Sequence, residues 1–424
     1  MIAGISTEAL AGRLVTGGAI LDVRPVAAFN GWRLAGEARG GHLPGARSMP
    51  REWTRYLDWV DVAEAKQLDP AEPITIYGYT ADDTRELADR LDRLGFREIF
   101  VYDRFVDEWS ADAGRPLDRL ERYRQLVHSG WLHALIRGEG AEQPPRSGWV
   151  LCHAHFDNPA DYDAGHIPGA LSLDTNTLES PETWNHREPR ELEQALLRLG
   201  IRHDTTVILY GRCSRPSYDQ PHPGQRAGQL ATMRCALIML YAGVEDVRVL
   251  NGGIHSWLAA GYELSTHETA PAPAHDVGMT IPGHSEYIVD LPEARQMIEA
   301  PDAELVSVTS WREFTGEFSG YHYIAKRGRI PGAVFGNCGS DAYHMENYRN
   351  LDHTTREYAE IARNWAAAGI VPGKHIAFYC GTGWRASEAF MNAWFMGWPR
   401  ISIYDGGWYE WSADPGNPIA TGLP

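Results

Sequence analysis

The chain has 424 residues, of which 43% are hydrophobic and 22% charged, a composition that excludes an intrinsically disordered protein and predicts roughly two to four globular domains. The formal net charge of −17, without a concentrated basic face, excludes a nucleic-acid-binding protein. Five cysteines without framework spacing are typical of thiols in a reducing compartment. Neither a secretory leader nor an apolar run of about 18 residues is present, so we expect a soluble, cytoplasmic protein.

A six-residue signature occurs three times along the chain. It reads Gly-His-Leu-Pro-Gly-Ala at residues 41–46, Gly-His-Ile-Pro-Gly-Ala at 165–170 and Gly-Arg-Ile-Pro-Gly-Ala at 328–333. Self-similarity of this kind indicates tandem copies of one structural unit. We therefore expect three copies of one domain.

Each signature lies between two short apolar segments that we expect to be strands, and a third such segment follows. These expected strands cover 19–23, 74–77 and 99–103 in the first copy, 149–152, 207–210 and 247–251 in the second, and 304–308, 376–379 and 401–405 in the third. Helical patterns separate them, and this alternation predicts a parallel sheet covered by helices on both faces. The fold class is therefore α/β, with three tandem domains, each a parallel sheet flanked by helices.

Breaker-rich segments mark the boundaries between the copies. Residues 138–147 contain Gln-Pro-Pro and follow a stretch at 117–137 that we expect to be helical, and residues 269–283 contain an Ala-Pro-Ala-Pro-Ala run. Such sequences are typical of linkers. The expected domains are residues 1–140, 148–268 and 284–424.

The residue after the second strand distinguishes the three copies. In open parallel sheets the chemistry lies in the loops that follow the carboxyl ends of the strands. Each second strand ends in tyrosine, and the next residue is Gly78, Gly211 or Cys380. We therefore expect the third domain to be the catalytic one.

Cys380 begins the loop Cys-Gly-Thr-Gly-Trp-Arg, which ends at Arg385 and leads into an expected helix at 386–397. A thiol beside a helix N-terminus meets free backbone N–H groups and the positive end of the helix dipole, which favour the thiolate. Gly381 and Gly383 would allow the loop to curl around an anion. We expect Cys380 to be a nucleophile, the alternative being a small buried apolar cysteine.

The signature, the loop from Cys380 to Arg385 and the closing Asp-Gly-Gly-Trp at 405–408 resemble the rhodanese (sulfurtransferase) family, and the resemblance covers all three domains. Related phosphatases of the cell-cycle type have a loop one residue longer that fits a phosphate, whereas this loop would fit a sulfur atom. The resemblance implies that Cys380 takes a sulfane sulfur, becomes a persulfide and passes the sulfur on. The persulfide anion would lie under the loop amides, and Arg385 would tie the loop to the domain.

Within that family the chain is similar to the rhodanese-like enzymes of anaerobic ergothioneine synthesis, which have a Cys-Gly-Thr-Gly-Trp-Arg loop. This resemblance implies transfer of sulfur from polysulfide to the imidazole carbon of hercynine, the trimethyl betaine of histidine. Tyr321 matches a tyrosine that would bond the imidazole and move a proton, and Tyr379 and Thr382 match residues that contact the imidazole and the sulfur chain. Ser307 stands where a further cysteine is expected.

The composition of the third domain is compatible with a cationic aromatic acceptor. A trimethylammonium group needs aromatic faces or a carboxylate, and this domain has Trp311, Phe314, Tyr321, Tyr323, Trp384, Trp408, Tyr409 and Trp411. Trp384 belongs to the loop itself, where we expect it to be exposed. Removal of the carbon-bound proton requires an acid or base, the role expected of Tyr321. The expected substrate contacts are Tyr379, Gly381, Thr382, Gly383, Trp384 and Arg385.

The other cysteines and two histidines have weaker interpretations. Cys152 and Cys338 resemble accessory cysteines of the ergothioneine-forming group, Cys213 lies two residues after Gly211 in a proline-rich loop, and Cys235 fits an apolar helix. His153 and His155 would share a strand face, but no third ligand with metal spacing accompanies them. We expect neither a metal nor a cofactor.

Two other functions remain open at this level. One is a thiosulfate or polysulfide sulfurtransferase with cyanide or a thiol as acceptor, and the other is a non-catalytic sulfur carrier. The expected partners are a small-molecule sulfur donor, polysulfide or thiosulfate, and an imidazole betaine, with neither nucleic acid nor a membrane. A homodimer is one of the arrangements that the sequence leaves open.

Overall fold

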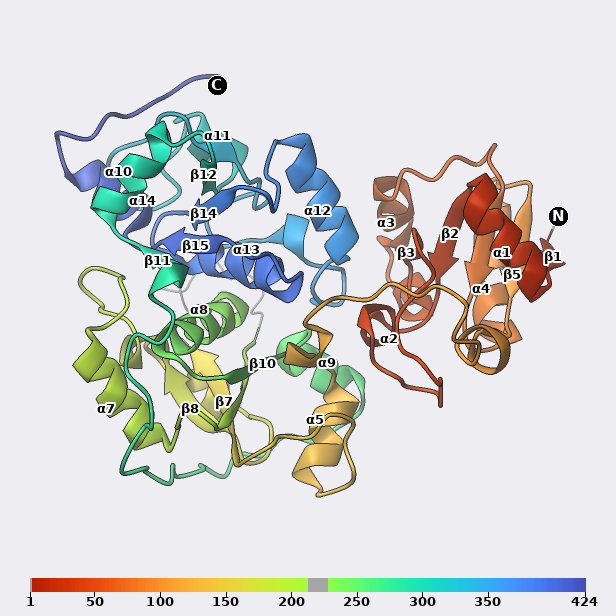
Figure 1. Ribbon diagram of the computed structural model, residues 1–424, viewed down its shortest axis with the longest axis horizontal. Helices are drawn as coiled ribbons and strands as arrows, with labels where there is room; N and C mark the ends of the chain where they lie inside the picture. The colour runs from red at the N-terminus through yellow and green to blue at the C-terminus, as the bar shows by residue number, and fades with distance from the viewer. Residues whose placement is uncertain (1, 213–227) are drawn as a thin grey trace. The chain divides into compact units, whose positions relative to one another are not determined.

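The computed structural model describes residues 2–212 and 228–424 (Figure 1). The chain divides into two compact units, Met1–Arg124 and Gln125–Pro424. The described part of the first unit contains one five-stranded parallel sheet, and that of the second unit contains two. The predicted α/β class with three parallel sheets is therefore confirmed. Within the described residues, no helix has the length and apolar character needed to cross a bilayer.

The first domain is the first unit, and its sheet has the strand order β1-β5-β4-β2-β3. The strands are β1 (Ile2–Gly4), β2 (Ala19–Asp22), β3 (Arg47–Ser48), β4 (Ile74–Tyr77) and β5 (Ile99–Tyr102), and the helices include α1 (Thr7–Thr16), α2 (Val26–Asn30), α3 (Trp59–Ala65) and α4 (Ala81–Arg93). Leu87, Ala88 and Leu91 form one apolar face of α4 and pack into the core with Ile76 of the central strand.

The second domain begins at β6, and its sheet has the order β6-β10-β9-β7-β8. The strands are β6 (Leu126–Val127), β7 (Trp149–His155), β8 (Leu171–Asp174), β9 (Thr206–Tyr210) and β10 (Asp246–Leu250). Its helices include α5 (Ser129–Ile136), α6 (Ala160–Asp163), α7 (Pro189–Leu199), α8 (Gly228–Ala242) and α9 (Gly253–Ala259).

The third domain repeats this order as β11-β15-β14-β12-β13. The strands are β11 (Ile288–Val289), β12 (Ala303–Ser307), β13 (Val334–Phe335), β14 (His375–Tyr379) and β15 (Ile401–Tyr404). The helices include α10 (Leu291–Glu299), α11 (Trp311–Phe314), α12 (Tyr358–Ala367), α13 (Trp384–Phe395) and α14 (Gly407–Ala413). The three sheets thus have the same topology, as the repeated signature predicts.

One expected boundary differs from the structure. The stretch 117–137, expected as a helix of the first domain, contains β6 and α5 instead, and β6 pairs with β10 of the second sheet. The first domain therefore ends at Arg124 and not at residue 140. A two-residue strand is too short to show an alternating pattern, so its pairing could not be read from the local sequence.

The second and third domains meet along their central helices. Helix α8 (green) packs against α13 (blue) (Figure 1). Every residue of both helices is buried. A helix that is buried on all sides needs partners on every face, so α13, which follows the Cys380 loop, depends on the second domain for part of its packing.

Candidate active site

Cys380 is the first residue after β14, a central strand of the third sheet, and it is fully buried. Its carbonyl oxygen accepts a hydrogen bond from Trp408 N at 2.7 Å, and that of Gly381 accepts one from Tyr409 N at 2.9 Å. These bonds tie the loop to the start of α14. Gly383 has φ +85°, a left-handed conformation that favours glycine, and α13 begins directly after it.

The amides of this loop are available to an anion. The backbone N–H groups of residues 381–385 donate to no other group in the described part of the chain, whereas Ser387 N already bonds Gly383 O at 2.8 Å. Free N–H groups at a helix N-terminus are a general site for anions. The curled loop predicted around Cys380 is therefore present, with its donors unused.

Tyr321 lies directly on this loop. A Cβ atom built on Gly381 would come within 2.2 Å of the Tyr321 ring and 2.6 Å of its hydroxyl oxygen, so only glycine allows this approach. Tyr321 is 8% exposed, and burial raises the pKa of its phenol well above the usual value, against the influence of Arg385. Tyr321 is therefore a buried residue and not an exposed loop tyrosine.

Arg385 links Tyr321 to a buried carboxylate. It donates to both oxygens of Glu313, at 2.9 and 2.8 Å, and its Nη2 also donates to the Tyr321 hydroxyl at 2.8 Å. Arg385 Nη1 lies 3.1 Å from Cys338 Sγ. Arg385 thus ties the loop to the domain, as expected, and also fixes the phenol. Glu313 was not expected, although Ser310 and Glu313 form a capping box that the sequence spacing could have indicated.

The tyrosine before the loop has a structural role in every copy. The Tyr379 hydroxyl accepts from Ile330 N at 3.2 Å, the Tyr77 hydroxyl from Leu43 N at 3.1 Å and the Tyr210 hydroxyl from Ile167 N at 2.8 Å. Each donor is the third residue of the repeated signature. Burial raises the pKa of Tyr379 to about 12. The signature and the strand-ending tyrosine are therefore two halves of one contact, which the two copies with glycine at the position of Cys380 also make.

Trp384 is buried, contrary to the expectation that it lies exposed in the loop. It is 7% exposed, and its indole N–H donates to both carboxylate oxygens of Glu179 in the second domain, at 3.0 and 3.1 Å. Its ring also meets Phe156 of the second domain edge to face, with centroids 5.5 Å apart. Trp384 is thus a contact between domains and not an open platform for a substrate. Thr382, also buried, hydrogen-bonds Tyr323.

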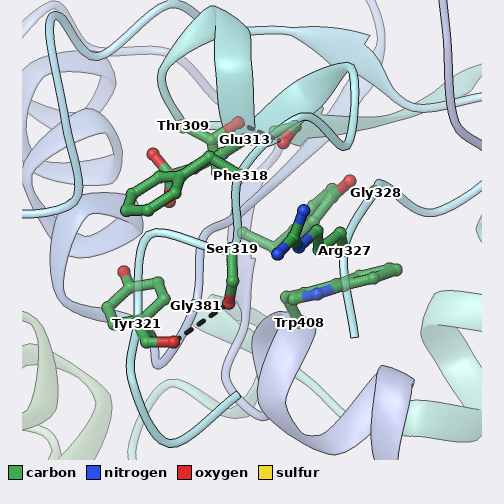
Figure 2. Close-up of a pocket in the computed structure, with 11 residues that line it drawn as sticks. Thr309, Glu313, Phe318, Ser319, Tyr321, Arg327, Gly328, Gly381 and Trp408 are labelled. Carbon is green, nitrogen blue, oxygen red and sulfur yellow. Dashed lines mark hydrogen bonds between the residues drawn. The ribbon is translucent and has the colours of Figure 1, made fainter. Parts of the chain in front are cut away.

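A small pocket, with Gly381 among its lining residues, lies beside the loop (Figure 2). Tyr321 and Gly381 lie on one side of it and Arg327 and Trp408 on another, as Figure 2 shows. Its volume of ≈ 10 Å³ is enough for about one water-sized group. The remaining lining residues include Ser307, whose hydroxyl lies 2.9 Å from that of Thr309. A pocket of this size holds an imidazole betaine only if side chains that line it move.

The aromatic residues of the third domain divide into two groups. Tyr321, Tyr323 and Tyr409 lie near the loop, in contact with one another through Tyr323. Trp408 also lies beside the loop, where it lines the pocket and donates its indole N–H to Lys326 O. The others pack elsewhere: Trp311 and Phe314 contact Phe335, and Trp411 is in the core.

The first and second copies, which have glycine at the position of Cys380, are closed where the third copy has its thiol. A Cβ atom on Gly78 would lie 2.6 Å from Val23 Cγ2, and one on Gly211 would lie 2.0 Å from Gly228 O. Burial raises the pKa of Cys152 and Cys338 to about 12 and that of Cys235 well above its usual value, so none is disposed to be a thiolate. Cys213 lies outside the described residues. Within the described ranges, no three His, Cys, Asp or Glu side chains come together as metal ligands.

Comparison with known proteins places the chain. Residues 6–112, 156–260 and 290–414 match the rhodanese-like domain. The chain belongs to the rhodanese-like family. A full-length rhodanese-like relative, thiosulfate sulfurtransferase YnjE of Escherichia coli strain K12, is 40% identical over 412 residues, which cover 96% of this chain and 89% of the relative.

Solved structures agree over the whole chain. EanB in complex with ergothioneine has 49% identity and a TM-score of 0.98, with 100% of both chains covered. The anaerobic ergothioneine biosynthesis enzyme from Chlorobium limicola, in complex with its substrate trimethyl histidine, has 49% identity, a TM-score of 0.97 and the same coverage. An EanB variant with a cysteine persulfide, solved with ergothioneine, has 50% identity and a TM-score of 0.97, covering 99% of this chain and 100% of the other.

Proposed function

We propose that the protein is a sulfurtransferase that carries sulfane sulfur as a persulfide on Cys380 and transfers it to the imidazole carbon of hercynine, forming ergothioneine. The observation that carries the proposal is the juxtaposition at the loop: a thiol at the end of β14, unused amides at residues 381–385, and a buried phenol on Gly381. The bound ligands of the similar EanB structures support the choice of acceptor.

The transfer step balances without a cofactor. A Cys380 persulfide, written R–S–S–H, reacts with the imidazole C–H to give R–S–H and the sulfurated carbon, C–S–H. One S–S bond and one C–H bond break, and one C–S bond and the S–H bond of the Cys380 thiol form. The sulfane sulfur is reduced by two electrons as the carbon is oxidised by two, and the proton lost from carbon balances the proton that the departing Cys380 thiolate takes up. The free amides of residues 381–385 would stabilise the anionic sulfur during this exchange.

Tyr321 is proposed as the group that handles the proton. Its oxygen already accepts a hydrogen bond from Arg385, so its own hydroxyl hydrogen is free to bond an imidazole nitrogen placed beside Gly381. Because burial raises the pKa of Tyr321, the phenol is neutral at physiological pH and can donate. Glu313 balances the charge of Arg385 and keeps the guanidinium directed at the phenol.

Loading of Cys380 and transfer to the acceptor can be tested in separate steps. Treat the protein with polysulfide, remove the excess and measure the intact mass, which should increase by the mass of one or more sulfur atoms. Then add hercynine and look for a product heavier by one sulfur atom. A Cys380→Ala variant should lose both steps, whereas Cys235→Ala, which changes a buried residue of α8, should retain both.

The same measurements distinguish the alternatives. Rapid thiocyanate formation from thiosulfate and cyanide, without a hercynine product, would replace the proposal by a general thiosulfate sulfurtransferase, the activity in the name of YnjE. Loading without transfer to either acceptor would indicate a sulfur carrier. We also propose polysulfide as the sulfur donor. A cytoplasmic location is proposed from the cysteine content, which is typical of thiols in a reducing compartment.

A further inference from the structure

The second domain has no cysteine at the position of Cys380, yet it presents buried charge to the catalytic domain. Arg234 lies in the middle of α8, the helix that packs on α13, and its side chain is fully buried. An arginine in such a place needs partners for its charge and its donors. Those partners come from both domains.

Arg234 makes three contacts that cross or approach the domain boundary. Its Nε donates to Glu179 of the second domain at 2.8 Å, and its Nη1 donates to Asp405 of the third domain at 2.6 Å. Its Nη2 donates to the carbonyl oxygen of Trp184 at 2.7 Å. His186 N and Nδ1 bond the other oxygen of Asp405, at 2.7 and 2.8 Å. Burial opposes the ionisation of Asp405, but Arg234 and His186 outweigh it and hold the pKa of that carboxyl below its usual value.

This network reaches the Cys380 loop at two points. Glu179, which accepts from Arg234, also accepts the indole N–H of Trp384, the residue that begins α13. Gly383 lies against the guanidinium, because a Cβ atom there would be 3.0 Å from Arg234 Nη1. The end of the loop is therefore held by two buried charged side chains of the second domain.

A second path from Arg234 reaches the middle of the loop. Trp184, whose carbonyl oxygen Arg234 holds, has φ +65°, an uncommon conformation for a bulky residue. Its ring stacks between Phe156 and Tyr323, with centroids 5.5 and 5.8 Å away. Tyr323 in turn hydrogen-bonds Thr382. The second domain thus supports the loop in two ways, through the polar contact of Glu179 with Trp384 and through the aromatic contact of Trp184 with Tyr323. Arg234 bonds both Glu179 and Trp184.

We infer that the second domain completes the catalytic site: Arg234 and Glu179 are positioning residues that hold the Cys380 loop in the geometry for sulfur transfer. The physical reason is that the loop amides act on the persulfide only if they point at it, and these amides make no hydrogen bond in the described part of the chain that would hold their direction. This role gives a reason for the presence of a domain that has glycine at the position of Cys380. The part that concerns hercynine rests on the proposed function.

The mildest test removes one hydrogen bond from the network. Trp384→Phe keeps an aromatic ring against Phe156 but loses the N–H that binds Glu179. Trp365→Phe is the matched control, because Trp365 is also buried in the third domain and its indole N–H donates to the Tyr348 hydroxyl at 2.8 Å. We expect Trp384→Phe to lower the single-turnover rate of transfer from a preloaded persulfide about tenfold or more, with the acceptor KM changed less than about threefold.

The control variant shows how much the transfer rate changes when the variant only loses stability. Trp365→Phe should lower the melting temperature by a similar amount while the transfer rate stays within about twofold of the wild type. If the two variants lose rate in the same proportion, or if neither loses any, the inference is overturned. The readout is the rate of sulfur transfer from a preloaded persulfide. The number of loaded active sites is measured by intact mass, and a rate expressed per loaded site does not change when part of the protein unfolds.

A second pair of variants tests the arginine itself. Arg234→Lys keeps the charge but has a single nitrogen, which cannot reach the three groups that Nε, Nη1 and Nη2 of Arg234 bond. Arg248→Lys is the control, because it changes a buried arginine that pairs with Asp246 and bonds Gln143 O, both in its own domain. We expect slower transfer for Arg234→Lys only, and faster hydrogen exchange at the amides of Trp408 and Tyr409, which bond the carbonyl oxygens of Cys380 and Gly381. Unchanged exchange together with unchanged transfer would overturn the inference even if Arg234→Lys is less stable.

The failure of this inference is distinguishable from the failure of the proposed function. The same comparison of variants can be made with cyanide as the acceptor, since cyanide needs only the persulfide and its loop. A wild-type protein that transfers sulfur to cyanide but never to hercynine overturns the proposed function, and the variants still show whether the second domain positions the loop.

Discussion

In the proposed mechanism the Tyr321 hydroxyl group is needed for sulfur transfer to hercynine but not for formation of the persulfide on Cys380. Tyr321→Phe removes that group but keeps the ring that packs on Gly381. We predict that sulfur transfer to hercynine falls by about 10²- to 10⁴-fold, the usual contribution of a positioned acid or base. Loading of Cys380 by polysulfide should be unaffected, because the loop amides that stabilise the persulfide remain. Single-turnover kinetics and intact mass measure the two steps separately.

Tyr348→Phe serves as the control for this prediction. Tyr348 is also buried in the third domain, and its hydroxyl donates to Gly336 O at 2.6 Å. Its loss should reduce stability without separating loading from transfer. Equal losses of both steps in Tyr321→Phe would show that Tyr321 is structural.

At the level of single residues, the sequence predicted what lies near Cys380 in the chain and missed what folding brings there. The loop from Cys380 to Arg385 and the closeness of Tyr321 agree with the expectation. Trp384 does not, because its partner Glu179 lies 205 positions earlier, in another domain. No local pattern marks Glu179 as that partner, since its burial depends on the packing of α8 on α13.

Among elements, the central strands were predictable and the edge strands were not. β4 has the expected bounds, and β9, β14 and β15 differ by one residue at one end, because continuous apolar runs mark strands buried on both faces. The strands β1, β6 and β11 have two or three residues each and pair at the edge of their sheets. Their pairing comes from partners more than 90 residues away, such as Ile99 for Ile2, and carries no local signal.

The closed loop of the second domain leads to a prediction about that element. In Gly211→Cys the new Cβ atom would lie 2.0 Å from Gly228 O, so the loop must shift before it can hold a side chain. We predict a loss of about 1–3 kcal/mol in the free energy of unfolding, the usual cost of overpacking. Denaturant unfolding measures the loss.

The same substitution, placed in a Cys380→Ala chain, should not restore persulfide transfer. Gly140→Cys is the control, because nothing lies within 4 Å of a Cβ atom at that exposed position. Transfer activity from the new cysteine at position 211 would contradict the view that this copy is closed to chemistry.

The stability of the second domain should depend on pH through His153. His153 is fully buried in β7, neither ring nitrogen has a partner among the described residues, and burial, together with nearby positive groups, lowers its pKa to about 3. A histidine with an unfolded pKa near 6.5 then binds a proton only in the unfolded chain between pH 6.5 and about 3. Its contribution to stability is complete above pH 6.5, and about 1.4 kcal/mol is lost for each pH unit below it.

We predict that His153→Leu removes this slope. The free energy of unfolding of the variant should depend less on pH between 6 and 4 than that of the wild type, by about 1.4 kcal/mol per pH unit. Denaturant titrations at several pH values provide the measurement, and His275→Leu, at an exposed position, is the control. Parallel slopes for wild type and His153→Leu would show that another group takes up the proton.

At the scale of the whole molecule, the site and its support belong to one unit. Cys380, Tyr321 and Arg385 lie in the third domain, Arg234 and Glu179 lie in the second, and all are within Gln125–Pro424. The first domain has its own parallel sheet and core, and none of the contacts described around the loop comes from it. Of the three copies predicted from the sequence, the first therefore forms a unit by itself, and the second and third together form the other unit.

This division predicts the result of a truncation. A chain of residues 125–424, which begins just before β6, should fold and should load and transfer sulfur within about threefold of the full-length rate, because a compact unit with its own cores keeps its structure. A chain of residues 284–424 should instead aggregate or lose transfer, since it exposes the face of α13 that packs on α8. Circular dichroism and single-turnover assays on both chains make the comparison. If residues 125–424 fold but lose transfer more than about tenfold, the first domain contributes to the site and the division of labour inferred from the contacts is wrong.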